Sequence, residues 1–287
     1  MTDDDTLLSP IATQHERLWT PWRMRYIGGD QTEPGCIFCN RLQATDDRAS
    51  LILHRGRRAF VIMNLFPYNT GHVMIVPNEH APSPESLDIE TITDMAHLAP
   101  RTLKALRGAL NPAGFNLGTN VGAVAGAGIA AHLHQHVVPR WQGDANFMPI
   151  LAGTMVLPEL IPVTYAKIRA EFARDSADNV VILAVDAKNA ALLIDTTGDQ
   201  ARLPRHHLTG EPVWRTAASF LDQIGAPGSL AGWAGASSTT DDGIPALAFD
   251  IEPGMAPGEG YAWRDVGTVL NNLTETDGAL LAGAIQL

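Results

Sequence analysis

The stretch that decides the fold is residues 131–141, Ala-His-Leu-His-Gln-His-Val-Val-Pro-Arg-Trp. It places His132, His134 and His136 at alternate positions, and these are three of the ten histidines in the chain. Side chains alternate between the two faces of a strand, so a strand here would point all three imidazoles the same way. Burying three imidazoles together is costly without a partner. The pattern therefore predicts a zinc site or a phosphate site rather than scattered core histidines.

A glycine-rich loop comes directly before the histidines. Residues 121–128 read Val-Gly-Ala-Val-Ala-Gly-Ala-Gly, with glycines at 122, 126 and 128. Glycine allows neighbouring backbone N–H groups to converge on an anion, although it also serves ordinary turns. Because this loop would deliver its amides beside three imidazoles, its position favours a phosphate ester as the ligand.

Composition and charge limit the class of protein. A chain of 287 residues is long for one hydrophobic core and long enough for two domains. Its composition, 45% hydrophobic and 18% charged, is typical of a soluble globular protein. The net charge of -11 argues against nucleic-acid or anionic-membrane partners, which need basic surface. The acidic start, Met1-Thr-Asp-Asp-Asp, has no signal-peptide core, and no apolar run approaches the ~20 residues that span a bilayer. We therefore expect a cytoplasmic protein that binds neither nucleic acid nor membrane.

The only two cysteines form one Cys-x-x-Cys motif, Cys36 and Cys39, which excludes a disulfide framework. Such a pair is usually half of a zinc site or a redox pair. A redox motif normally opens a helix after a strand, whereas this one precedes the first convincing strand. Zinc is therefore favoured, and two further ligands must come from elsewhere in the chain.

The residues up to 175 predict one α+β unit. An amphipathic helix is expected over 87–110, where Pro100 predicts a kink or a break into two helices. The first of the expected strands ends near the polar Asn64 and is followed by a turn at 67–71. The strands expected from apolar runs are 58–65, 72–77, 115–120 and 131–141, and a further helix is expected at 158–173.

The chain resembles the histidine triad (HIT) family over roughly residues 18 to 172. The family signature is His-φ-His-φ-His-φ-φ, where φ is apolar, and it stands here as residues 132–138. Asn64, the Gly71-His72 pair and the Cys-x-x-Cys motif also match. The aromatic arm at 18–27 and the segment 139–147 resemble the bacterial branch of diadenosine tetraphosphate hydrolases and phosphorylases. The resemblance implies an antiparallel sheet with helices and a homodimer.

The resemblance also implies roles for individual residues. His134 would be the nucleophile that attacks the α-phosphorus of a nucleotide or dinucleoside polyphosphate, and His136 would contact the phosphate and help protonate the leaving oxygen. Loop amides and His72 would offset developing negative charge. The expected catalytic residues are thus His134 and His136, and the expected substrate-binding residues are Asn64, His72, Asn120, Gly126, Gly128 and His136.

In zinc-containing relatives the same resemblance completes a metal site. It implies Cys36, Cys39, His80 and His132 as ligands, with His54 as a competitor of His80. A complete Cys2His2 set has no open position for catalysis, so the zinc would be structural.

Gly128 stands where many HIT enzymes place a serine or threonine that binds phosphate. Its missing hydroxyl favours a hydrolase over a phosphorylase. Two other hypotheses stay open. One is a nucleotide-binding sensor whose two halves read one ligand without turnover, and the other is a catalytic metal held by His132, His134 and His136 together.

A second domain is expected over 179–287, after a linker at 174–178. Apolar runs predict strands at 179–186, 190–195 and 245–251 and helices at 212–224 and 275–285. This order resembles a Nudix fold, an αβα sandwich. The helix before Gly225 offers only Asp222-Gln223 where the Nudix motif needs a pair of glutamates to hold magnesium. We therefore expect a Nudix-like domain without Nudix catalysis, with an unrelated α+β domain as the alternative.

Overall fold

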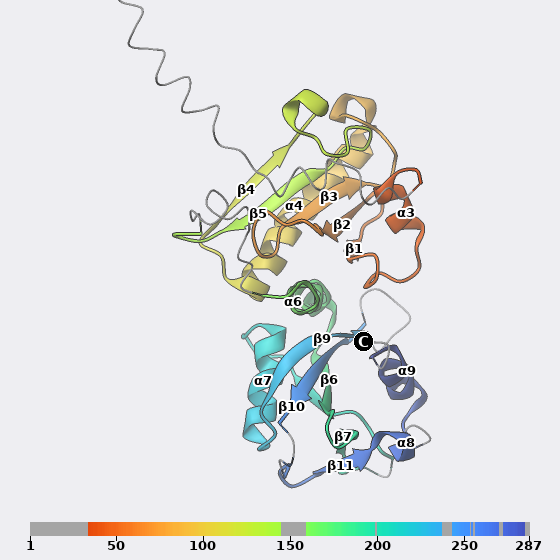
Figure 1. Cartoon of the computed structure of the whole chain (residues 1–287), viewed down its shortest axis with the longest axis vertical. Helices are drawn as coiled ribbons and strands as arrows, with labels where there is room; N and C mark the ends of the chain where they lie inside the picture. Colours follow the sequence, from red (N-terminus) through yellow and green to blue (C-terminus); the bar gives the residue numbers. More distant parts are fainter. Residues whose placement is uncertain are drawn as a thin grey trace, which may run out of the picture.

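The computed structural model describes residues 34–144, 159–198, 200–236, 243–252, 254, 256–269 and 272–284 (Figure 1). The aromatic arm at 18–27 and the part of the 139–147 segment beyond residue 144 lie outside the described residues. Among the described residues, no helix is both long and apolar enough to cross a lipid bilayer.

The first sheet is antiparallel and has five strands in the order β1-β2-β3-β5-β4. The strands expected near 58–65, 72–77 and 115–120 are confirmed as β2, β3 and β4, whereas β1 was not expected. The bounds are Ile52–Arg55 for β1, Ala59–Met63 for β2, Val73–Pro77 for β3, Gly114–Thr119 for β4 and Gln135–Arg140 for β5.

Helix α4 covers Ile89–Leu110 as one helix of 22 residues, so the predicted break at Pro100 is wrong. Asp88 caps its first turn by accepting the N–H of Thr91 at 2.7 Å. A proline removes only one helical hydrogen bond, and here the buried face of the helix runs on past it. The buried side chains on this face are Thr91, Leu98, Thr102, Ala105, Leu106 and Ala109.

The two faces of the first sheet pack against different partners. Leu53, Val61 and Ile75 join a cluster that contains residues of α4 and of α6, Ile161–Ala173. Ile52, Phe60, Ile62, Met74 and Val76 form a separate cluster with Phe38 of α3, a short helix over Ile37–Gln43 that the sequence pattern did not indicate. The α3 face carries the candidate site.

A second sheet follows in the order β11-β7-β6-β10-β9, with β8 paired to β6. The strands expected at 179–186, 190–195 and 245–251 and both expected helices are confirmed, whereas β8, β9 and β11 were not expected. The strand bounds are Asn179–Asp186 for β6, Ala191–Asp195 for β7, Arg205–His207 for β8, Gly228–Ala236 for β9, Pro245–Ile251 for β10 and Tyr261–Asp265 for β11. The helix bounds are Val213–Gln223 for α7, Val266–Val269 for α8 and Glu275–Ala284 for α9.

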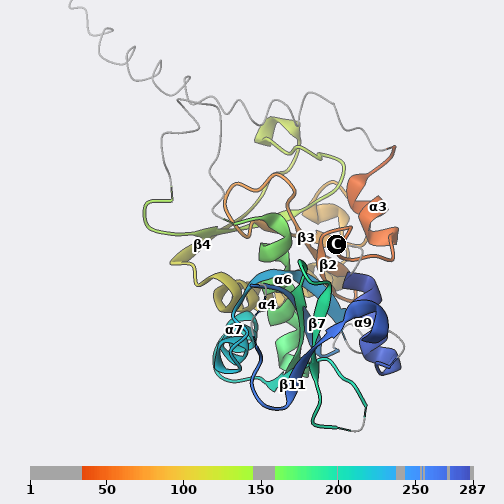
Figure 2. The same cartoon turned by 60° about the horizontal axis from the view of Figure 1, so that its bottom comes forward.

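The second sheet lies between helices, as expected of an αβα sandwich. Phe220 of α7 packs in one cluster with Ile182 and Phe249, whereas Leu280 and Leu281 of α9 pack in the cluster on the other face. Figure 2 shows α7 and α9 on opposite sides of this sheet. The identification of this half as Nudix-like, and the domain limits 1–175 and 179–287, stay predictions.

The expected linker is a short 3-10 turn, Arg174–Ser176, and the two halves share a core. Tyr165 and Phe172 of α6 belong to one buried cluster with residues of both sheets. Figure 1 shows α6 between the two sheets. The hydroxyl of Tyr165 donates to the carbonyl of Ile52 in β1 at 2.8 Å, which ties this helix to the first sheet.

Candidate active site and metal centre

The three triad histidines do not share one face of a strand, so that prediction is wrong. Strand β5 begins at Gln135, and only His136 lies within it. The chain before it leaves the ladder, because the N–H of Leu133 donates at 2.6 Å to the carbonyl of Ala81, beyond the end of β3. This local departure separates the imidazoles: His132 turns towards the cysteines, whereas His134 and His136 line a pocket.

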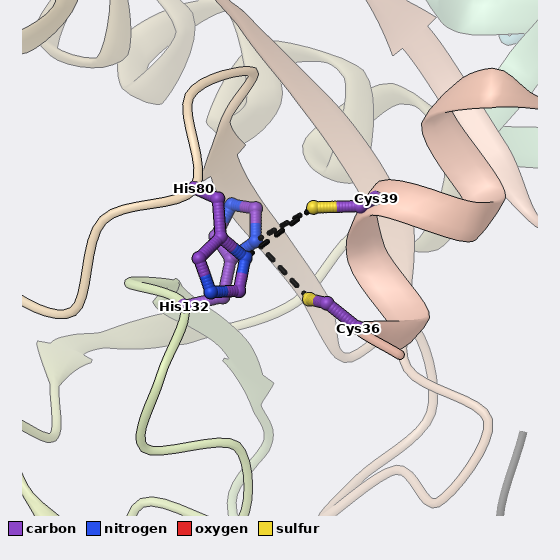
Figure 3. Close-up of side chains that lie close together, drawn as sticks. All are labelled: Cys36, Cys39, His80 and His132. Carbon is purple, nitrogen blue, oxygen red and sulfur yellow. Dashed lines mark hydrogen bonds between the residues drawn. The ribbon is translucent and has the colours of Figure 1, made fainter. Parts of the chain in front are cut away.

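Cys36, Cys39, His80 and His132 bring one ligand atom each to within 4.8 Å of one another (Figure 3). Nδ1 of His132 lies 3.3 Å from Sγ of Cys36 and 3.6 Å from Sγ of Cys39, and Nδ1 of His80 lies 3.4 Å from Sγ of Cys39. Tetrahedral zinc, with Zn–S of about 2.3 Å and Zn–N of about 2.0 Å, requires ligand separations of this size.

The chemistry of the donor set also agrees with zinc. Nε2 of His132 lies 2.9 Å from the carbonyl of Pro77, so it carries the proton and leaves the Nδ1 lone pair directed at the thiols. Burial lowers the pKa of His132, which keeps the ring in the neutral form that a metal needs. Two thiols and two imidazoles complete a four-coordinate set without an open position.

Two competing assignments of metal ligands are wrong. Among the residues that the structure describes, the only group able to hold a metal contains one triad histidine, His132, so His134 and His136 do not join it in a catalytic metal site. His54 is also outside the cluster. Its Nε2 lies 2.9 Å from Nη1 of Arg101, and its ring stacks on Phe172 at 5.4 Å.

A pocket opens on the α3 face of the first sheet. Of the expected substrate-binding residues it includes Asn64, Gly126, Gly128 and His136, whereas His72 and Asn120 are not among its lining residues. Half of its lining is apolar and was not identified from the sequence, because these residues come from separate segments without a shared motif. The full lining is Phe38, Asn64, Phe66, Tyr68, Met74, Gly126, Gly128, Ile129, His134 and His136.

The imidazole of His134 is neutral, and one of its two nitrogens carries no proton. Its Nδ1 lies 2.9 Å from the carbonyl oxygen of His132, an acceptor, so Nδ1 carries the proton. The lone pair is therefore on Nε2. Burial lowers the pKa of His134, which is 4% exposed, so the ring is uncharged near pH 7. A neutral imidazole with a bare Nε2 is a nitrogen nucleophile that needs no separate base.

His72 is buried against His136 and does not line the pocket, so the structure gives no support to the expected substrate contact. The ring of His72 is fully buried, and its Nδ1 accepts the N–H of Tyr68 at 3.0 Å. Its proton must then lie on Nε2, which donates to Nδ1 of His136 at 2.9 Å. Burial, with the neighbouring His136 and His134, lowers the pKa of His72 to about 3. The neutral tautomer of His136 therefore carries its own proton on Nε2.

Asn64 and the glycine loop use part of their hydrogen-bonding capacity internally. Oδ1 of Asn64 accepts the N–H of Phe66 at 2.9 Å, and its Nδ2 lies 3.3 Å from Nδ1 of His72. The N–H groups of Gly126 and its two neighbours donate to carbonyls within the loop, so the expected convergence of loop amides on an anion is not seen for these three. The Gly128 N–H donates to no other described residue and lies beside the pocket.

The pocket belongs to the first half of the chain. Within the described segments, every residue that lines it lies between Phe38 and His136. Helix α6, which connects to the second half, packs instead with Leu53, Val61 and Ile75 on the opposite face of the first sheet. The hypothesis of a sensor whose two halves read one ligand therefore has no support from the described residues.

Comparisons with known proteins show what this chain is similar to. A family model described as HIT domain matches residues 47–143. The AP-4-A phosphorylase of Mycobacterium tuberculosis is 37% identical over 185 residues, which cover 60% of this chain and 94% of that relative. An uncharacterized HIT-like protein of Mycoplasma genitalium is 30% identical over 116 residues, 40% of this chain and 80% of the relative. A solved structure described as a zinc-bound histidine triad family protein, from Mycobacterium smegmatis, has 24% identity and a TM-score of 0.40, covering 49% of this chain and 94% of that one.

Proposed function

This chain belongs to the histidine triad family, and from this premise we propose that it cleaves dinucleoside polyphosphates such as diadenosine tetraphosphate at the α-phosphate. The observation that carries the proposal is the complementary protonation of two neighbouring histidines. His134 presents a bare Nε2 and His136 a protonated Nε2, and both residues line the pocket.

In the first step Nε2 of His134 attacks the α-phosphorus. A P–N bond forms, and the P–O bond to the remaining polyphosphate breaks with its electron pair leaving on oxygen. His136 donates a hydrogen bond from Nε2 to the oxygen on which charge develops, as does the Gly128 N–H. A polyphosphate leaves as a weakly basic anion, so a neutral hydrogen-bond donor is sufficient. The Nδ1 proton of His134 stays on the ring and remains hydrogen-bonded to the carbonyl oxygen of His132 throughout.

In the second step an acceptor oxygen attacks the same phosphorus and breaks the P–N bond. Water yields a nucleoside monophosphate, and inorganic phosphate yields a nucleoside diphosphate. The name of the Mycobacterium tuberculosis relative favours phosphate, against the preference for water drawn from Gly128. The two acceptors differ in their products, so one assay distinguishes them.

The test is to incubate the protein with diadenosine tetraphosphate, with and without inorganic phosphate, and to identify the products by phosphorus NMR. We expect ATP in both reactions, with ADP as the second product when phosphate is the acceptor and AMP when it is water. His134→Ala should abolish turnover, whereas His97→Ala, which changes an exposed histidine on α4, should retain it. Wild-type turnover by His134→Ala would contradict the mechanism.

The remaining elements of the proposal are a structural zinc, a homodimer and a cytoplasmic location. Zinc on Cys36, Cys39, His80 and His132 would hold α3 against the segment that begins the triad. Neither cysteine is in a disulfide, which agrees with a reducing compartment. The dimer is supported by β4, which ends the sheet and exposes Leu117 (44%), followed by Val121 (47%). Light scattering would test the dimer, and we expect Leu117→Lys to weaken it.

A further inference from the structure

Asp144 lies just beyond β5 and does not line the pocket, yet its carboxylate accepts hydrogen bonds from four donors. Its side chain is 9% exposed. Arg140 donates to it from Nε at 2.7 Å and from Nη2 at 2.8 Å, and the N–H of Trp141 donates at 3.0 Å. A fourth donor, Nδ2 of Asn69, comes from a turn about 75 positions earlier in the chain, at 2.8 Å.

Asn69 links this carboxylate to the turn between β2 and β3. Its Nδ2 also donates to the carbonyl of Pro139 at 3.1 Å, and its Oδ1 accepts the N–H of Thr70 at 3.1 Å. Its own carbonyl accepts the N–H of His72 at 3.0 Å. Asn69 is therefore bonded on one side to the end of β5 and on the other to the residue that orients His136.

The same turn supports the tautomer of His72, together with Asn64, whose Nδ2 lies 3.3 Å from Nδ1 of the ring. Tyr68, the residue before Asn69, directs its N–H at Nδ1 of His72, and Nε2 of His72 then donates to Nδ1 of His136. If the turn shifted, the N–H of Tyr68 would leave Nδ1, and His72 could take up its proton there. Nε2 of His72 would then become an acceptor, and His136 could carry its proton on Nδ1, pointing away from the substrate.

We propose that Asp144 is a positioning residue that acts through Asn69 on the turn at 67–71 and thereby keeps the His136 proton on Nε2. The kinetic consequence rests on the proposed function, whereas the tautomer does not. The ion pair with Arg140 and the Trp141 N–H orient the carboxylate so that one of its oxygens faces Asn69. Hydrogen bonds that position a catalytic group from outside the pocket are expected to affect the rate, because small displacements of that group slow the reaction strongly.

The test is Asp144→Ala, read by the ring 15N signals of the histidines, which differ between the two neutral tautomers. We expect wild-type His136 to be protonated on Nε2 and the variant to gain the Nδ1 form. Asp144→Asn, whose amide oxygen can still accept from Asn69, should restore the wild-type spectrum. Asp175→Ala is the matched control, because it removes an exposed ion pair with Lys104 and should change neither spectrum nor rate.

In turnover, Asp144→Ala should lower kcat about 10- to 100-fold with a smaller change in KM. Asn69→Ala should have a similar effect, and the double variant should lose little more than either single variant. An unchanged His136 tautomer in Asp144→Ala would overturn the proposal, as would additive losses in the double variant. If the wild type turned over no nucleotide, the proposed function would fail while the 15N spectra still tested the role of Asp144.

Discussion

His72 donates from Nε2 to Nδ1 of His136 across 2.9 Å, and it does so as a fully buried neutral ring. A histidine that matched the expected phosphate contact is therefore buried against His136 and does not line the pocket. It determines which nitrogen of His136 holds a proton, and through that nitrogen it affects the chemistry of the pocket.

The contribution of His72 to catalysis can be separated from its contribution to packing. We expect His72→Phe to keep the ring volume but remove the donor, and to lower kcat about 10- to 100-fold, because His136 loses its orientation. Steady-state kinetics with diadenosine tetraphosphate would measure this, with His97→Phe as the exposed control. A variant with wild-type kcat would show that the hydrogen bond to His136 has no catalytic role.

The lowered pKa of His72 predicts a loss of stability in acid. The ring has a pKa of 6.5 in the unfolded chain and about 3 in the folded protein, so between these values only the unfolded chain takes up the proton. This contribution is therefore fully present above pH 6.5 and is lost as the pH falls. Between pH 7 and pH 4 the wild type should lose about 3 kcal/mol more unfolding free energy than His72→Phe. Urea titrations with a chelator present would measure the difference, and equal losses would refute it.

Metal removal should destabilise the first half of the chain. We expect one zinc per chain by elemental analysis, and a melting temperature lower by about 10 °C after chelation, because binding free energy is folding free energy. Cys39→Ser should lose the metal. His134→Ala and His54→Asn should both retain it, since neither residue belongs to the cluster. Loss of zinc from His54→Asn with retention in a His80 variant would reverse the ligand assignment.

Two glycine-to-alanine substitutions in helices should have opposite effects, because only Gly108 lies at the contact between α4 and α6. A Cβ on Gly108 would clash with Oε2 of Glu171, whose other oxygen accepts the N–H of Val213 at 2.7 Å. Gly108→Ala should therefore destabilise the protein by about 1–2 kcal/mol. A Cβ on Gly278 in α9 meets nothing within 4 Å, so Gly278→Ala should stabilise by up to about 1 kcal/mol. Urea unfolding would compare them, and stabilisation by both would contradict the tight packing.

The sequence by itself predicted the family, most of the strands and helices, and the four candidate metal ligands that the structure brings together. The triad spacing, the Cys-x-x-Cys motif and the apolar runs are local patterns, and local patterns are readable without contacts. The resemblance to the family added an expected role for each triad histidine, structural for His132 and catalytic for His134 and His136. Elements without a strong period, such as α3, β1 and β9, were missed because packing rather than pattern selects them.

Only the tertiary structure decided which way each imidazole points. The hydrogen bond between Leu133 and Ala81 takes His132 and His134 out of the strand, and a contact between residues 52 apart cannot be read from an alternating pattern. The same holds for the tautomer of His136, which depends on Tyr68 and His72 in another turn. The protonation of His136 follows from a hydrogen-bond partner 64 positions away in the sequence, and that partner is in place only once the sheet has formed.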